Sequence, residues 1–141
     1  MHWQHGDYSL TDETTRLELA VVIALLRATY WAADRSSETI ECSLRHSLNF
    51  GLFHGGEQIG FARVVTDRAT VGYLCDVVIA EGHRGQGLGK WLLNSILKHP
   101  ELRGCRIDLF TKDAQEFYAA FGFGPHRYTN MVRYPKAESV Q

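Results

Sequence analysis

The sequence has few of the features that mark disulfide-bonded or metal-binding proteins. Its three cysteines, Cys42, Cys75 and Cys105, are odd in number and widely spaced, so they form neither a paired framework nor a Cys-x-x-Cys motif. Its seven histidines form no His-Glu-x-x-His or other short ligand spacing. We therefore expect reduced thiols and no bound metal.

Long apolar runs are also missing. The longest uncharged apolar run, residues 19–26, is far shorter than the roughly 20 residues that a helix needs to cross a bilayer. The first residues lack the basic and apolar pattern of a secretory leader. These two absences predict a cytoplasmic protein without a membrane partner.

Neither sign of charge dominates the chain. The formal net charge is −1, which argues against general nucleic-acid binding. The charge is unevenly spread: residues 1–41 hold seven acidic and three basic side chains, whereas residues 82–106 hold five basic and one acidic. The basic region contains the most distinctive motif of the sequence.

The length and composition predict one domain. A chain of 141 residues, with 45% apolar and 22% charged residues, is large enough for a single core and too short for two ordinary ones. No repeat, low-complexity tract or linker interrupts it. We therefore assign residues 1–141 to a single soluble globular domain.

Hydrophobic periodicity and capping residues predict a mixture of helices and strands. The β-branched and aromatic run 71–79 is typical of a central strand. The chain is predicted to begin with a helix that is capped by Thr11 or Asp12 and runs to Ala28, followed by a helix over 37–47. Strands over 50–54 and 58–65, joined by a tight Gly55-Gly56 turn, then precede the strand over 71–79. The remaining predicted elements are a helix over 87–99, a strand over 105–110, a helix from a cap at Asp113 to Phe121, and a last strand or hairpin arm over 127–134.

The stretch HRGQGLGKWLL, residues 83–93, places three glycines at alternate positions between an arginine and a lysine, and then enters an apolar helix. Glycine costs chain entropy wherever the backbone is ordered, so this cluster indicates a need such as the close approach of a ligand. A strand that leads through such a turn into a helix points unpaired N–H groups and the positive end of the helix dipole at one spot. The pattern predicts an anion site made of backbone.

Two familiar phosphate-binding loops do not fit this spacing. A P-loop requires Gly-x-x-x-x-Gly-Lys-[Ser/Thr], but Arg84 stands five residues before Gly89, and Trp91 follows Lys90. The dinucleotide fingerprint Gly-x-Gly-x-x-Gly is missed because the glycines here are spaced Gly-x-Gly-x-Gly. Neither a kinase nor a dehydrogenase is favoured.

The segment Arg84-Gly85-Gln86-Gly87-Leu88-Gly89 matches Arg/Gln-x-x-Gly-x-Gly/Ala, the pyrophosphate signature of the GNAT superfamily of N-acyltransferases. The chain also resembles small single-domain bacterial members of that family in three further stretches, Tyr30-Trp31-Ala32, GFARVVTD at residues 60–67 and HPEL at residues 99–102, and in the later FYAAFGF. The resemblance implies an α+β fold of three α/β/α layers, with a mixed, mostly antiparallel central sheet and helices on both faces.

The resemblance also implies an activity, which is acetyl-CoA-dependent transfer of an acetyl group to a primary amine by direct attack. Acetyl-CoA would be the cosubstrate, and a small molecule or peptide the acceptor. A homodimer is compatible with this reading. The alternative is a non-catalytic acyl-CoA-binding sensor or interaction module. Turnover of acetyl-CoA with release of free thiol separates the two.

The residues that would bind the cosubstrate follow from the family's motifs. The pantetheine pairs with the end of the fourth strand of the family, which corresponds to Val77, Val78 and Ile79. Asp113 stands where the family commonly has an asparagine, so it keeps an acceptor and loses a donor. The pyrophosphate would lie on the N–H groups of the loop, and the expected contact residues there are Arg84, Gly85, Gln86, Gly87, Leu88, Gly89 and Lys90.

Two residues are candidates for the catalytic groups. Tyr118, within FYAAFGF, matches the tyrosine that acts as general acid near the CoA sulfur in many family members. Asp76 is the candidate base because a carboxylate in an apolar strand is costly unless it is paired or reacting. A structural pairing of Asp76 with Arg63 is the alternative, and Glu81 and His83 lie near the loop as further candidates.

The resemblance places Tyr30, Trp31, Arg35 and Arg63 beside the acceptor, although the two aromatic residues are equally plausible in the core. The two arginines indicate an acceptor with a carboxylate or phosphate, whereas the acidic residues 1–41 indicate a cationic amine. The sequence leaves this conflict open.

Overall fold

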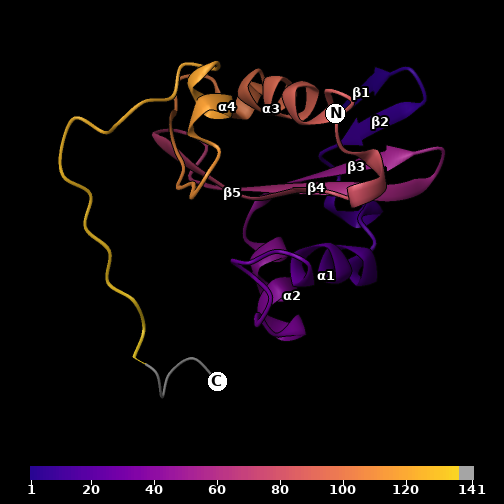
Figure 1. The fold of residues 1–141 in the computed structure, drawn as a ribbon, viewed down its shortest axis with the longest axis horizontal. Helices are drawn as coiled ribbons and strands as arrows, with labels where there is room; N and C mark the ends of the chain where they lie inside the picture. Colours follow the sequence, from indigo (N-terminus) through magenta and orange to yellow (C-terminus); the bar gives the residue numbers. More distant parts are fainter. Residues whose placement is uncertain (137–141) are drawn as a thin grey trace. The chain divides into compact units, whose positions relative to one another are not determined.

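The structure of the protein, a computed structural model, describes residues 1–136 (Figure 1). These residues form two compact units, residues 1–110 and residues 111–136. No helix in the described part is long and apolar enough to span a membrane.

A six-stranded sheet is the centre of the first unit, and its strands follow one another in chain order. Its strands are β1 (His2–His5), β2 (Tyr8–Thr11), β3 (Leu48–His54), β4 (Glu57–Thr66), β5 (Val71–Ile79) and β6 (Arg106–Asp108). Neighbouring strands from β1 to β5 are antiparallel, whereas β6 runs parallel to β5. The sheet is therefore mixed and mostly antiparallel, as expected.

Helices cover both faces of this sheet, which confirms the layered architecture (Figure 1). Helices α1 (Leu19–Arg27) and α2 (Ser37–Arg45) lie on one face, and α3 (Leu88–Leu97) lies on the other. The α1 and α2 face closes over an apolar cluster that includes Val22, Ile40, Phe61 and Val78. Short 3-10 helices complete the unit, namely η1 (Thr14–Arg16), η2 (Glu81–His83) and η3 (Pro100–Leu102).

The predicted start of the first helix is wrong, because residues 1–11 form a hairpin. Thr11 is the last residue of β2 and pairs with Gly51 of β3, and its Oγ1 accepts a hydrogen bond of 3.1 Å from the N–H of Glu13. The hydroxyl that resembled a helix cap thus holds the turn that leaves the sheet. Helix α1 begins only at Leu19.

The strands and helices around the glycine loop agree better with expectation. Strand β5 has the predicted bounds and pairs with a neighbour on each side. The Gly55-Gly56 turn joins β3 to β4, with positive φ at both glycines. Helix α3 begins one residue after the predicted start and ends two residues before the predicted end, since His99 caps η3 by accepting from the N–H of Glu101.

The second unit contains one short helix among its described residues, α4 (Gln115–Ala119). Asp113 does not cap it: the N-cap residue is Ala114, whose N–H donates to Oγ1 of Thr111 at 3.0 Å. The predicted strand over 127–134 is not formed within the described residues. The N–H of Tyr128 donates instead to Nδ1 of His126, its near neighbour in sequence.

Candidate active site

The glycine loop joins the end of β5 to the start of α3. Gly85 has φ of 78° and Gly87 has φ of 79°, in the left-handed region that glycine adopts without steric cost. Gly87 is the N-cap residue of α3. Apart from its chain neighbours, no heavy atom of the described residues lies within 4 Å of where a Cβ would stand on either glycine. The loop is exposed from Arg84 to Gly87. An approaching ligand therefore meets bare backbone.

Three successive N–H groups of this loop have no acceptor in the described part of the chain, whereas the N–H of Arg84, at its start, donates to the carbonyl of Glu81 at 3.3 Å. Within residues 1–136, those of Gly85, Gln86 and Gly87 donate no hydrogen bond, and no side chain caps α3. Free N–H groups at a helix N-terminus, together with the helix dipole, favour an anion. This geometry fits the pyrophosphate of a CoA cosubstrate.

Tyr8, from the N-terminal hairpin, fastens the loop. Its hydroxyl lies 3.0 Å from Nδ1 of His83 and donates to Oε1 of Gln86 at 3.2 Å. Since the hydroxyl proton goes to Gln86, the consistent arrangement has Nδ1–H of His83 donating to Tyr8. The ring of His54 stacks on Tyr8, with centroids 4.5 Å apart. Sequence analysis missed this role because it placed no strand at Tyr8.

Strand β5 leaves one of its edges open next to the loop. Strand β6 pairs with β5 only from Val71 to Tyr73, while β5 continues to Ile79. Beyond Tyr73, β5 pairs only with β4 within the described residues. Val77, Val78 and Ile79 lie on this stretch, and the carbonyl of Ile79 accepts a hydrogen bond from Nε of Arg84 at 2.8 Å. The edge groups that remain unpaired are suited to amide groups that bind in the manner of an added strand.

A β-bulge interrupts β5 just before these residues. The register between β4 and β5 shifts between Phe61 and Arg63, and Asp76 has φ of 56°. Aspartate is among the few residues that tolerate this conformation. The bulge changes the direction of the side chains, so that the carboxylate of Asp76 meets the α1–α2 connection and Arg63.

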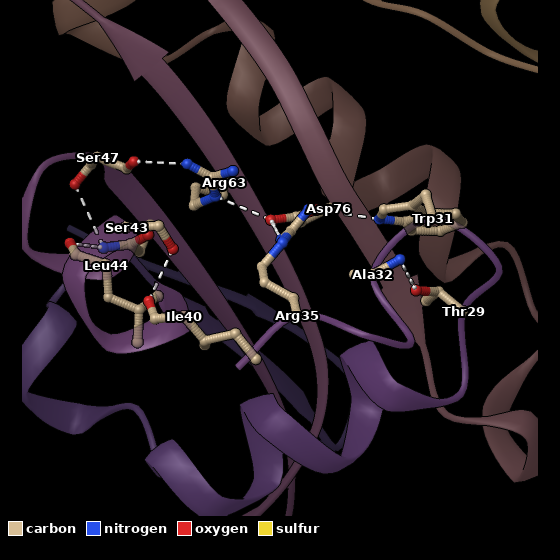
Figure 2. Close-up of polar contacts among 11 residues, drawn as sticks. Thr29, Trp31, Ala32, Arg35, Ile40, Ser43, Leu44, Ser47, Arg63 and Asp76 are labelled. Atoms are coloured by element: carbon tan, nitrogen blue, oxygen red, sulfur yellow. Dashed lines mark hydrogen bonds and ion pairs between the residues drawn. The ribbon is translucent and has the colours of Figure 1, made fainter. Parts of the chain in front are cut away.

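Figure 2 shows the polar cluster around this carboxylate, which we call the Asp76 cluster: Asp76, Trp31, Arg35 and Arg63. Oδ1 of Asp76 accepts from Nε1 of Trp31 at 3.0 Å. Oδ2 accepts from Nη1 of Arg35 at 2.8 Å and from Nε of Arg63 at 2.9 Å. Arg63 also donates through Nη1 to Oγ of Ser47 at 3.1 Å. The buried carboxylate thus has two cationic partners.

The structure brings together most of the residues assigned to the acceptor. The pairing of Arg63 with Asp76, considered from the sequence, is present. Tyr30 and Trp31 are not core residues: they are 62% and 43% exposed, and their rings meet edge to face at 5.0 Å. The contacts to Trp31 and Arg35 were not predictable, because they depend on the bulge at Asp76.

Cys75, beside Asp76, is a poor nucleophile in this environment. Burial raises the pKa of its thiol to about 11, and the nearby Arg63 offsets this only in part. The thiol is therefore protonated at neutral pH. Burial also raises the pKa of Tyr73, which belongs to the same strand. No group of three or more metal-ligating side chains occurs within residues 1–136.

The remaining predicted residues lie apart from the Asp76 cluster or in the second unit. Lys90 and Glu81 are exposed, and His83 is occupied with Tyr8. Tyr118 is half-buried on α4, where its ring contacts those of Phe117 and Phe123 at centroid distances of 5.1 and 5.8 Å. Asp113 is exposed just before that helix.

Comparison with known proteins identifies the family. Residues 17–123 match the model of the acetyltransferase (GNAT) family, which spans more than half of the chain. The fold and the loop thus define an acetyltransferase-type protein, and the chain belongs to the GNAT acetyltransferase family.

Individual relatives agree with this assignment. A provisionally assigned acetyltransferase of Gibberella zeae is 31% identical, over 83% of this chain and 78% of the relative. The crystal structure of a provisionally assigned GNAT acetyltransferase from Xanthomonas campestris is 36% identical, with a TM-score of 0.88 over 94% of each chain. A GNAT acetyltransferase from Elizabethkingia anophelis, solved with acetyl-CoA bound, shares the fold at 16% identity and a TM-score of 0.62, over 84% of this chain and 74% of that one.

Proposed function

We propose that this protein is an acetyl-CoA-dependent N-acetyltransferase that acetylates a primary amine of a small molecule or peptide. The observation that carries the proposal is the loop of unpaired N–H groups between β5 and α3, next to the open edge of β5. The family uses acetyl-CoA, and a neighbour of the same fold holds it. The proposed cosubstrate residues are Val77, Val78, Ile79, Arg84, Gly85, Gln86, Gly87, Leu88, Gly89, Lys90 and Asp113.

The proposed reaction is a direct attack. The neutral amine nitrogen attacks the thioester carbonyl carbon, the C–N bond forms, and collapse of the intermediate breaks the C–S bond. The amine loses one proton, and the departing thiolate gains one from Tyr118. The state of Cys75 supports direct attack over an acyl-cysteine intermediate, since a thiol with a pKa near 11 is protonated at neutral pH. A backbone N–H near Val78 is the proposed donor to the oxyanion.

The hydrogen bonds of Asp76 favour a positioning role over that of general base. Both carboxylate oxygens already accept from protein donors, and two of those donors are cationic. Proton abstraction would require a carboxylate oxygen to leave these partners. We therefore propose that Asp76 positions Trp31 and Arg35, and that water accepts the proton of the amine.

Tyr118→Phe tests the proposed acid, because it removes one hydroxyl and almost no volume. We expect kcat to fall by roughly 10- to 1,000-fold at neutral pH, with little change in affinity for acetyl-CoA. The loss should shrink with an acyl donor whose thiol is more acidic, since that leaving group needs less help.

Tyr128→Phe is the matched control, because this tyrosine is exposed and lies in the same unit. Equal activity of the Tyr118 and Tyr128 variants with every donor would reduce Tyr118 to a packing residue and leave protonation of the thiolate to solvent. Binding of acetyl-CoA with no turnover on any amine would favour a non-catalytic acyl-CoA-binding module instead.

A further inference from the structure

The Asp76 cluster carries more positive than negative charge. Two guanidinium groups, those of Arg35 and Arg63, share the single carboxylate of Asp76. No other ion pair within residues 1–136 includes either arginine. Their side chains are only 24% and 13% exposed, so the excess charge is largely withdrawn from water. A partly desolvated cation without a full counter-charge is a favourable position for an anion.

Arg35 also keeps hydrogen-bond donors that the protein does not use. A guanidinium has five N–H donors in a planar fork. In the described part of the chain, Arg35 donates only through Nη1, to Asp76. Its Nε and Nη2 groups therefore remain for a ligand. Such a fork matches the paired oxygens of a carboxylate or a phosphate.

The contacts around Asp76 hold Arg35 in place before any ligand arrives. The carboxylate is fixed from three sides, by Trp31, Arg35 and Arg63 (Figure 2). A donor that is already oriented loses less conformational entropy on binding. The exposed rings of Trp31 and Tyr30 lie on the same connection and provide an apolar surface for the body of a small molecule.

The cluster is also next to the proposed site of acetyl transfer. Asp76 directly precedes Val77, the first residue of the β5 stretch proposed to bind pantetheine. An anion held by Arg35 would therefore belong to the acceptor. We propose that the acceptor is a primary amine that carries a carboxylate or a phosphate in the same molecule, and that Arg35 binds this anionic group. This inference rests on the proposed N-acetyltransferase function.

The test compares amines in matched pairs that differ by the anionic group. The carboxylate arm uses L-phenylalanine against L-phenylalaninamide, and the phosphate arm uses O-phosphoethanolamine against ethanolamine. We expect the anionic member of at least one pair to have a kcat/KM roughly 10- to 100-fold higher, as charged hydrogen bonds are typically worth that much. The arm that shows the preference identifies the anion.

Variants of Arg35 test whether this residue causes the preference for the anionic amine. Arg35→Gln should remove it and leave KM for acetyl-CoA unchanged, and Arg35→Lys should restore only part of it, because an ammonium lacks the fork. Arg27→Gln is the matched control, since Arg27 is exposed on α1 and its side chain bonds only Ser37 among residues 1–136. Melting temperatures measured alongside show whether each variant remains folded.

The outcomes separate this inference from the proposed function. Equal turnover of neutral and anionic amines, or a preference that survives in Arg35→Gln, would overturn the anionic acceptor while acetyl transfer stands. Failure of every amine in the panel to release CoA thiol, although acetyl-CoA binds, would overturn the proposed function and this inference with it.

Discussion

Replacing Asp76 by asparagine should destabilise the protein more than a typical single substitution. The change keeps the shape of the side chain, and asparagine tolerates the φ of 56° at this bulge as well as aspartate does. It therefore tests the charge and not the backbone. The amide can still accept from Trp31, but the group that faces Arg35 and Arg63 becomes a donor or a weaker acceptor.

The magnitude follows from the burial of the three side chains. Removing one partner of a fully buried ion pair costs about 3–5 kcal/mol, since the remaining charge is left without compensation. Here Arg35 and Arg63 keep part of their exposure, 24% and 13% of each side chain, so water relieves some of this cost. We expect a loss of about 2–3 kcal/mol in the free energy of unfolding, which corresponds to a fall in Tm of roughly 5–15 °C for a domain of this size.

The assay is urea unfolding followed by tryptophan fluorescence, with thermal unfolding as a second measurement. Asp34→Asn is the control, because Asp34 is an exposed carboxylate on the same α1–α2 connection. We expect that control to change stability by less than about 0.5 kcal/mol. If Asp76→Asn is as stable as Asp34→Asn, the carboxylate does not hold the cluster together and the reasoning is refuted.

Three further predictions concern the loop, the buried thiol and a surface turn. Tyr8→Phe should raise KM for acetyl-CoA roughly 3- to 10-fold at unchanged kcat, because it removes the hydroxyl that bonds the side chains of Gln86 and His83. An unchanged KM would show that Tyr8 does not position the loop. Cys75 should resist iodoacetamide at pH 7 while the exposed Cys42 reacts, and the alkylation of Cys75 should rise toward pH 11, because burial raises the pKa of its thiol to about 11. Mass spectrometry of the peptides measures the labelling of each cysteine, and rapid labelling of Cys75 at pH 7 would contradict the prediction. The pKa of Asp67 is lowered by hydrogen bonds from the Thr70 side chain and from the N–H groups of residues 69–71. Its contribution to stability should therefore be full above pH 3.8 and lost as the pH falls further. A stability difference between the parent and Asp67→Asn that stays constant as the pH falls through this range would be inconsistent with this.

Local patterns predicted the elements around the loop well. The β-branched run over 71–79 predicted a strand, and the alternate glycines predicted a turn into a helix; both patterns act through neighbouring residues in the sequence. The structure confirms the strand β5 and the helix α3. The pairing of Asp76 with Arg63 was also open to prediction, since a carboxylate in an apolar strand requires a partner.

Features that depend on distant parts of the chain were not predictable in the same way. Thr11 can cap a helix or end a strand, and its pairing with Gly51 decides the outcome. Trp31 is apolar enough for the core, but its indole N–H reaches Asp76 only because a bulge redirects that carboxylate. The role of Tyr8 at the loop follows from the N-terminal hairpin, over whose first ten residues no element was predicted.

The measurement that tests the central claim most directly is release of CoA thiol from acetyl-CoA, followed together with formation of the N-acetylated amine, in the parent and in Gly87→Val. Valine is strained at the φ of 79° and fills the open space above the loop. Gly104→Val is the control, because Gly104 has φ of 89° and equally open surroundings outside the loop.

The account predicts one thiol released per amide formed, with kcat/KM for acetyl-CoA at least roughly 100-fold lower in Gly87→Val and close to the parent in Gly104→Val. Thiol release that does not depend on the amine, or equal kcat/KM in the folded Gly87→Val variant, would contradict it.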